Sequence, residues 1–372
     1  MGARTDIGPP PLFGTLGARL GFGAWAVGGG GWGTAGDEPE RLAAIHHAVE
    51  HGITFFDTAP TYGDGASETL LGRALHPHRD TVTIATKVGP RDDPRTSLEA
   101  SLRRLDTDRV DLVQLHEALE RWEWQIEKLH QLLEEQKARA IGLCNATYLQ
   151  LARALEIAPV VSYQGPYNLF DRDVEQRELP LCRDRRIAFL AYRPLASGLL
   201  TGKYPAPPDF PVADHRRKIY WFTGAEFERR RRAIERLRLV AARLGMGLPA
   251  LSLAWVLSRP GVTVVLTGAR NRDQVDQNLA TKGHLSPDIV EAIDTIVAEA
   301  FRPARATAAL TTAAATWGER ERFIIERLDG TRKAEQIAAE WTDRGGTPMI
   351  AAQVKVFVDQ LTEQGLIPAD SR

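Results

Sequence analysis

The stretch ITFFDTAPTY, at residues 53–62, decides the fold, because a short apolar run rich in aromatic residues ends in a polar residue, Asp57. Two later runs end in the same manner, VTIATK in Lys87 and VDLVQLH in His116. The three polar ends follow one another at intervals of about 30 residues, the length of one strand-plus-helix unit. Short, continuous apolar runs are typical of strands that are buried on both faces of a parallel sheet.

Five more runs of this kind extend the pattern along the chain. They are LGFGAW (20–25), ARAIGLCN (138–145), PVVSYQ (159–164), IAFLAY (187–192) and TVVLTG (263–268). Helical patterns such as ERLAAIHHAVEHG lie between most of them. About eight such units predict an α/β fold, a closed (β/α)8 or TIM barrel. In that architecture the carboxyl ends of the strands meet at one face, so we expect the polar end residues to converge there.

The polar ends indicate a proton-donating site around Tyr62. A free phenol is a weak acid with a reference pKa of about 10, and a neighbouring ammonium such as Lys87 favours loss of its proton. Asp57 would hold and balance that ammonium, and a neutral His116 could hydrogen-bond the oxygen that receives the proton. Such a set indicates carbonyl chemistry. Taken singly, each residue would more often be an ion pair or an accident of a strand end.

Longer motifs surround these residues. They are FDTAPTYGDGASETLLGRAL (56–75), ATK, QLH, KARAIGLCN, YQGPYNLFDRD, AYRPLASGLLTGKY and LTGARNRDQVDQN. In order, spacing and strand context they resemble the aldo-keto reductase superfamily across about residues 14–300. The resemblance implies an NAD(P)H-dependent enzyme that reduces a carbonyl to an alcohol by hydride transfer.

The resemblance also implies a catalytic tetrad. In it, Tyr62 is the general acid, the pair Lys87 and Asp57 tunes that acid, and His116 orients the substrate carbonyl. Each of the four stands within its own matching motif.

By the same resemblance, one set of residues would bind the cofactor, NADPH, with NADH as the alternative. The set is Asn145, Gln164, Tyr192, Arg193, Gly268, Arg270, Gln274 and Asn278. The two amides of Asn145 and Gln164 would hold the nicotinamide carboxamide, Tyr192 would stack on the ring, and GARNRDQVDQN would grip the adenosine end. Arg193 stands where many relatives have Ser, and its cation could bind a phosphate or an anionic substrate.

An aromatic cluster is the best candidate for a substrate-pocket wall or lid. It comprises Tyr220, Trp221 and Phe222, in a proline-rich stretch of the kind that shapes pockets at the carboxyl face of a barrel. Trp25, at the end of the first predicted strand, is a further candidate. The alternative is a loop packed on the barrel rim.

Other residues indicate no additional site. Two cysteines, Cys144 and Cys182, in 372 residues give no disulfide framework. The histidines of ERLAAIHHAVEHG, at positions 46, 47 and 51, are expected to be solvated or to cap a helix, and no metal site is predicted. The glycines at positions 28–31 predict a flexible loop rather than a Rossmann phosphate cradle.

The composition excludes some classes of partner. The formal net charge of −1 gives no general attraction to nucleic acid or anionic membranes. No apolar run approaches the roughly 20 residues that span a bilayer, and the N-terminus lacks the apolar core of a signal peptide. These patterns favour a cytoplasmic protein.

The tail forms a separate pattern. We predict a barrel domain over residues 1–302, a linker over residues 303–317, and a small helical domain over residues 318–372. LDGTRKAEQIAAEW and VKVFVDQLTEQGLI resemble a PqqD-like, winged-helix domain that holds the leader of a precursor peptide. The three strands expected before its first helix are not evident in TAALTTAAATW.

Three functions therefore compete. The first is a reductase whose tail recruits a precursor peptide or protein for natural-product tailoring. The second is a reductase of a small ketone, aldehyde or sugar, whose tail serves assembly. The third is an NADPH-binding interaction protein with little turnover, which the intact tetrad disfavours.

Overall fold

The structure is a computed structural model of the chain. It describes residues 19–29, 31–32, 37–281, 283–301, 318, 323–324, 333–343 and 351–363. It divides into two compact units, one of residues 1–222 and 237–290 and the other of residues 223–236 and 291–372. The predicted domain boundary near residue 302 stays a prediction.

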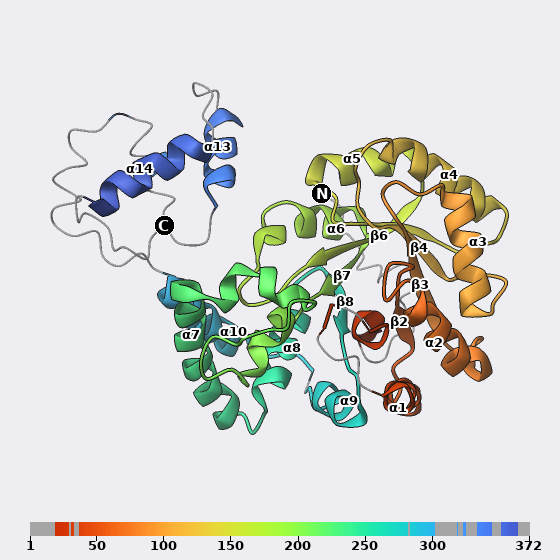
Figure 1. Ribbon diagram of the computed structural model, residues 1–372, viewed down its shortest axis with the longest axis horizontal. Helices are drawn as coiled ribbons and strands as arrows, with labels where there is room; N and C mark the ends of the chain where they lie inside the picture. The colour runs from red at the N-terminus through yellow and green to blue at the C-terminus, as the bar shows by residue number, and fades with distance from the viewer. Residues whose placement is uncertain are drawn as a thin grey trace, which may run out of the picture. The chain divides into compact units, whose positions relative to one another are not determined.

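In the described part of the chain, eight strands pair in parallel and close a barrel in chain order (Figure 1). They are β1 (Leu20–Gly23), β2 (Phe55–Asp57), β3 (Thr83–Val88), β4 (Leu112–Leu115), β5 (Ile141–Cys144), β6 (Val160–Pro166), β7 (Ala188–Tyr192) and β8 (Val262–Thr267). The sequence prediction of a parallel barrel is confirmed.

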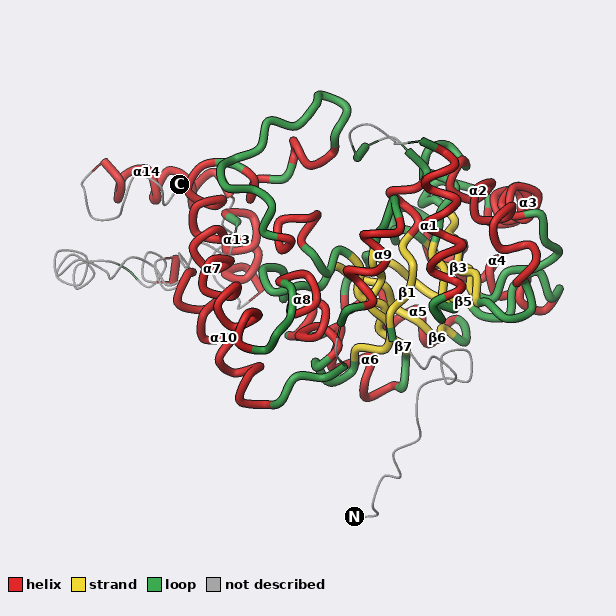
Figure 2. Tube along the Cα trace, turned by 90° about the horizontal axis from the view of Figure 1, so that it is seen from below, coloured by secondary structure: helices red, strands yellow, loops and turns green. Residues whose placement is uncertain are grey.

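Helices connect the strands, and Figure 2 shows the strands in yellow with red helices outside them. They are α1 (Glu38–Glu50), α2 (Ala66–Leu75), α3 (Pro94–Leu105), α4 (Trp122–Glu134), α5 (Tyr148–Ile157), α6 (Glu178–Arg185), α7 (Gly224–Arg243) and α8 (Leu248–Leu257). After β8 follow α9 (Arg272–Leu279) and α10 (Pro287–Phe301). The split between the two units falls within α7.

The strands are held by an apolar core. One buried cluster draws a side chain or two from most strands and fills the barrel as in other closed barrels. It comprises Phe55, Ala85, Leu112, Ala140, Ala188, Leu190, Val264 and Leu266. The continuous apolar runs of the sequence are thus strands buried on both faces.

Local capping explains where two of the helices begin. Asp93 precedes α3, and its carboxylate accepts from the backbone N–H of Thr96. Thr147 precedes α5 and forms a reciprocal capping box with Gln150. Each cap satisfies an N–H group that the first turn of a helix leaves unpaired. Both helices start shortly after a strand end, and so bring the chain back along the barrel wall.

The second unit contains α10 from Glu291 onward and the helices α13 (Ala334–Asp343) and α14 (Ala351–Glu363). An apolar cluster joins α13, α14 and a short preceding segment, through Phe323, Ile324, Ile337, Ala338, Val354 and Val358. The expected linker and most of the first expected tail helix lie outside the described residues. Two packed helices are common to many small domains, so the expected winged helix is not established.

Within the described residues, no single helix is long and apolar enough to cross a bilayer. The pair α7 and α8, bent by 88°, meets that test together by length and composition only. Almost every side chain of α8 is buried in the protein, as expected for a core helix.

Candidate active site

The four tetrad residues come together at the carboxyl end of the barrel. Asp57 is the last residue of β2, Lys87 is the penultimate residue of β3, and His116 directly follows β4. Tyr62 lies in the loop after β2. Neighbouring parallel strands end at the same edge of the sheet, which is why residues about 30 positions apart in sequence become neighbours in space.

Lys87 is the centre of the cluster. Its Nζ atom donates to Asp57 Oδ1 at 2.9 Å, to Asp57 Oδ2 at 2.7 Å and to the carbonyl of Thr58 at 2.8 Å. It lies 3.3 Å from the phenolic oxygen of Tyr62. The Lys87 side chain is fully buried, so its charge is neutralised by the carboxylate and not by water.

His116 also lies beside the phenol. Its ring centroid is 5.9 Å from that of Tyr62, with the two planes nearly perpendicular. Burial, followed by the charge of Lys87, lowers the pKa of His116 to about 3. The imidazole is therefore neutral at physiological pH and can donate a hydrogen bond from one ring nitrogen.

Burial raises the pKa of the Tyr62 phenol above its usual range, although the Lys87 ammonium lowers it. Burial also disfavours the Lys87 ammonium, but Asp57 and Tyr62 outweigh it and raise the pKa of Lys87. The expected effect of Lys87 on the phenol is present, but burial is the larger one. At neutral pH the site thus holds a protonated phenol beside an ammonium.

The loop that carries Tyr62 is fixed by a close backbone approach. Gly63 has a φ of +62°, and a Cβ atom there would lie 2.0 Å from the carbonyl oxygen of Gly28. A Cβ atom on Gly28 would lie 2.7 Å from the carbonyl oxygen of Tyr62. Only two glycines in contact allow this approach, so Gly28 is packed against the loop of Tyr62. The flexible loop expected over residues 28–31 stays a prediction.

The expected nicotinamide ligands surround the tetrad. Gln164 donates from Nε2 to Asp57 Oδ1 at 2.8 Å. Asn145, with a φ of +52°, donates from Nδ2 to the carbonyl of His116 at 3.0 Å and accepts from the Tyr192 hydroxyl at 2.8 Å. The structure thus brings the predicted cofactor amides into hydrogen-bond contact with two tetrad residues.

These strand ends and their spacing are those of a known family. Residues 19–298 match the Aldo/keto reductase family. The chain belongs to the aldo/keto reductase family. It is an enzyme of the oxidoreductase class that acts on carbonyl or alcohol groups, and the resemblance read from the motifs is confirmed.

Several individual aldo/keto reductases are similar to this chain over most of their own length. The chain is 36% identical over 276 residues to the aldo-keto reductase YhdN of Bacillus subtilis (strain 168), covering 70% of this chain and 83% of that one. The glycerol dehydrogenase AKR11B4 from Gluconobacter oxydans is 33% identical with a TM-score of 0.71, covering 78% of this chain and 94% of its own. An aldo/keto reductase from Klebsiella pneumoniae, in complex with NADP and acetate, is 27% identical with a TM-score of 0.61, covering 75% and 91%.

At the expected adenosine end, the residues after β8 bond to one another in this aldo/keto reductase fold. Gln274 accepts from the backbone N–H of Arg270 at 2.9 Å, and Asn278 donates to the carbonyl of Gly268 at 3.4 Å. Arg270 donates to the carbonyl of Trp32 at 3.3 Å. The loop before α9 is thus organised by the polar side chains that the resemblance singled out.

Sequence reasoning missed two cations near this loop, Lys203 and Arg216. Burial, and then the like charges of Arg216 and Arg270, lower the pKa of Lys203. Lys203 and Arg216 lie in the loop after β7, and Arg270 lies after β8. Both arginines repel Lys203, while Arg216 is also paired with Asp214 at 2.5 Å. Lys203 lies in the motif AYRPLASGLLTGKY, which could have indicated it from the sequence. No motif of the sequence indicated Arg216.

Of the predicted pocket residues, Trp25 and Trp221 contact other predicted site residues, whereas Phe222 and Tyr220 do not. The Trp25 ring stacks on that of Tyr62, at 5.8 Å between centroids and 24° between planes. The guanidinium of Arg193 lies 5.1 Å from the Trp221 ring, and its Nε atom is buried without a hydrogen-bond partner. Phe222 is instead buried against Phe210 at 4.9 Å, and Tyr220 is exposed.

His215 is a further residue that the sequence did not indicate. Its ring lies 4.5 Å from Trp25 and 4.3 Å from Trp32. Its Nδ1 atom bonds to the carbonyl of Gly31 and its Nε2 atom is buried without a partner. Two indoles and one imidazole thus form a wall beside Tyr62. Cys144 and Cys182 are free, as the sequence predicted, and both are buried.

Proposed function

We propose that the chain reduces a carbonyl group to an alcohol, with hydride from NADPH and a proton from Tyr62. The observation that carries this proposal is the position of Lys87, whose Nζ atom bonds to Asp57 and lies 3.3 Å from the Tyr62 oxygen. A phenol that gives up its proton next to a fixed ammonium leaves a phenolate stabilised by that charge.

The remaining groups position the substrate carbonyl. Its oxygen would accept hydrogen bonds from the Tyr62 hydroxyl and from the neutral His116 imidazole. Because His116 stays uncharged down to about pH 3, it orients the oxygen without competing as an acid. When bound, NADPH supplies the hydride, and its chemistry is that of the cofactor rather than of the protein.

The residues present fit a nicotinamide cofactor. The Nε2 atom of Gln164 is held by Asp57, so its carbonyl oxygen is the atom that would accept from a carboxamide. Tyr192 would present its ring to the nicotinamide. Lys203, Arg216 and Arg270 would face the phosphates. Both arginines repel Lys203, and this concentration of positive charge favours a ligand with an additional phosphate, hence NADPH over NADH.

The test of the proposal is Tyr62→Phe in an NADPH oxidation assay against a panel of ketones and aldehydes. General acid catalysis contributes about 10²–10⁴-fold, so we expect kcat to fall by that factor with little change in cofactor affinity. Tyr148→Phe, at the start of α5, is the matched control. Full activity in Tyr62→Phe would show that the assigned acid is wrong, and no activity in the parent would favour the low-turnover alternative.

For the tail we propose recruitment of a peptide or protein substrate. This rests on an apolar cluster of its own in residues that follow the family match, and on exposed Val356 in α14. Tethering a substrate raises its effective concentration, to about millimolar for a short linker. Truncation after Phe301 should leave turnover of small ketones unchanged and lower kcat/KM for a recruited peptide. Equal loss for both substrates would favour a role of the tail in assembly.

A further inference from the structure

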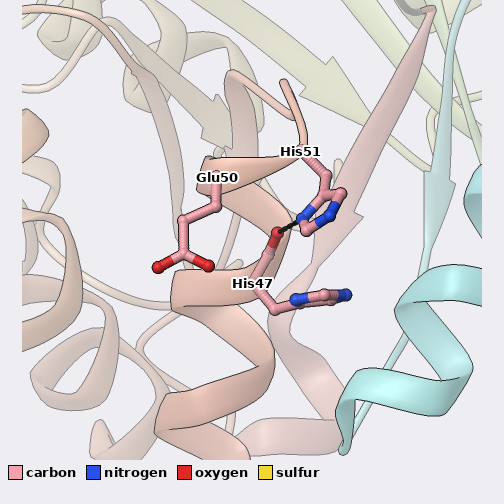
Figure 3. Close-up of side chains that lie close together, drawn as sticks. All are labelled: His47, Glu50 and His51. Atoms are coloured by element: carbon pink, nitrogen blue, oxygen red, sulfur yellow. Dashed lines mark hydrogen bonds between the residues drawn. The ribbon is translucent and has the colours of Figure 1, made fainter.

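A cluster of metal-ligating side chains lies outside the active site, at the carboxyl end of α1. His47, Glu50 and His51 each place one ligand atom within 4.8 Å of the others (Figure 3). In the part of the chain that the structure describes, this is the one group of three such residues that meets this criterion. Residues three and four positions apart share a helix face, which explains their meeting.

One nitrogen of each imidazole is already engaged by an acceptor oxygen. His47 Nε2 lies 2.7 Å from Asp276 Oδ1, and His51 Nδ1 lies 2.8 Å from the carbonyl oxygen of His47. An acceptor on that nitrogen requires an N–H, and in a neutral imidazole the other nitrogen then carries the lone pair. The free lone pairs are therefore on Nδ1 of His47 and on Nε2 of His51.

This arrangement is the one that metal-bound histidines adopt. Their second ring nitrogen donates to a carboxylate or a backbone carbonyl, which fixes the tautomer and the direction of the ring. The two rings lie 4.0 Å apart between centroids. The expectation from sequence was a solvated or capping role, and His51 does cap α1. Capping by Nδ1 is compatible with ligation by Nε2.

We propose that His47, Glu50 and His51 bind a divalent transition metal, with Zn²⁺ as the best match. Two imidazoles and a carboxylate suit Zn²⁺, and Asp276 orients His47 from outside the coordination sphere. Water would complete the tetrahedron. This proposal does not depend on the proposed reductase activity.

The three side chains must close further to hold an ion. Ligand atoms at about 2.0–2.2 Å from a tetrahedral Zn²⁺ lie about 3.3–3.6 Å apart, whereas one ligand atom of each residue now lies within 4.8 Å of the others. Glu50 and His51 are exposed and can rotate, while His47 is partly buried and held by Asp276. The fixed histidine would thus anchor the ion, and the two exposed side chains would close on it.

We expect the bound ion to stabilise the contact between α1 and α9, because His47 and Asp276 belong to those two helices. A bound ion would hold His47 in the orientation that donates to Asp276. Since this contact exists only in the folded chain, the ion would bind the native state preferentially and raise its melting temperature. The spacing His47-x-x-Glu50-His51 also occurs in a class of zinc peptidases, but an exposed glutamate here serves as a ligand rather than as a base.

The experiment is a titration of the full-length, tag-free protein with ZnCl₂ after dialysis against EDTA, followed by calorimetry and thermal unfolding. We expect one saturable equivalent and a higher melting temperature. His51→Ala should abolish both effects. His46→Ala, which removes a neighbouring imidazole of the same helix, should change neither.

Two further variants separate ligation from folding. Asp276→Asn keeps all three ligands, so it should retain one equivalent with an affinity about 10–100-fold weaker. Glu50→Gln, an exposed isosteric change, should weaken binding and leave the melting temperature without metal unchanged. The proposal is overturned if the parent shows no saturable binding, or if His51→Ala binds as the parent does. Parent affinity in Asp276→Asn would remove Asp276 from the site.

Discussion

Lys87 donates to both carboxylate oxygens of Asp57, at 2.9 and 2.7 Å, with the lysine side chain fully buried. Removing one member of a buried ion pair leaves an uncompensated charge, which costs about 3–5 kcal/mol. We therefore expect Asp57→Asn and Lys87→Met each to destabilise the protein by that amount in urea unfolding. The double variant should be less destabilised than the sum of the two, and simple additivity would contradict a coupled pair.

The pH dependence of stability should carry the signature of His116. Its pKa is lowered to about 3 in the folded state, against about 6.5 for an unperturbed histidine. Between these values the unfolded chain binds the extra proton, so stability rises with pH, by up to about 1.4 kcal/mol for each pH unit. This stability is complete above about pH 6.5 and is lost as the pH falls toward 3.

The measurement is urea unfolding at a series of pH values between those limits. His116→Gln should flatten the dependence, whereas His76→Gln, at a largely exposed histidine, should leave it unchanged. An identical slope in the parent and in His116→Gln would show that His116 is not the group responsible.

The contact between the loops of Gly28 and Gly63 provides a test of loop placement. Ala at either Gly63 or Gly52 suffers the left-handed backbone, at about 1–2 kcal/mol. Gly52 has a φ of +85° with nothing within 4 Å of its Cβ position, whereas at Gly63 the new atom meets a carbonyl at 2.0 Å. Gly63→Ala should therefore lose more stability and also reduce kcat by displacing Tyr62. Gly52→Ala should lose stability alone, and equal kinetic effects would contradict this explanation.

The cations near α9 should discriminate between cofactors. Lys203→Met removes one of the three, and a hydrogen bond to a charged group is worth about 1.5–3 kcal/mol. We expect the Kd for NADPH to rise by about 10-fold or more, and the Kd for NADH to rise less, measured by fluorescence titration. Lys218→Met, at an exposed lysine, is the control. Equal losses for both cofactors would place Lys203 away from the additional phosphate.

The sequence predicted the barrel and the meeting of three polar strand ends, because both follow from local patterns. Apolar runs of strand length mark the strands, and parallel closure gathers their ends. The spacing of one strand-plus-helix unit was enough to predict that Asp57, Lys87 and His116 meet. Tyr62 could be assigned only from the motif around it.

Other features depend on packing between loops that are distant in sequence. No periodic pattern in the sequence predicts three of these features. They are the contact of Gly28 with Gly63, the cluster of Lys203 with Arg216, and the wall formed by His215. Side-chain direction was also hidden, since three consecutive aromatic residues gave two buried side chains (Trp221 and Phe222) and one exposed side chain (Tyr220). Sequence could place these residues in loops but not say which of them face the phenol.

Asp57 also receives hydrogen bonds from Gln164 at 2.8 Å and from Gln114 at 3.4 Å. One carboxylate is therefore shared by the proton donor's lysine and by an amide expected to hold the nicotinamide. Selection for cofactor binding and selection for the acidity of Tyr62 would therefore both act on Asp57. A change of cofactor preference through Gln164 would thus alter the hydrogen bonding of the acid's own counter-ion. Evolution of the two properties would be linked in this barrel.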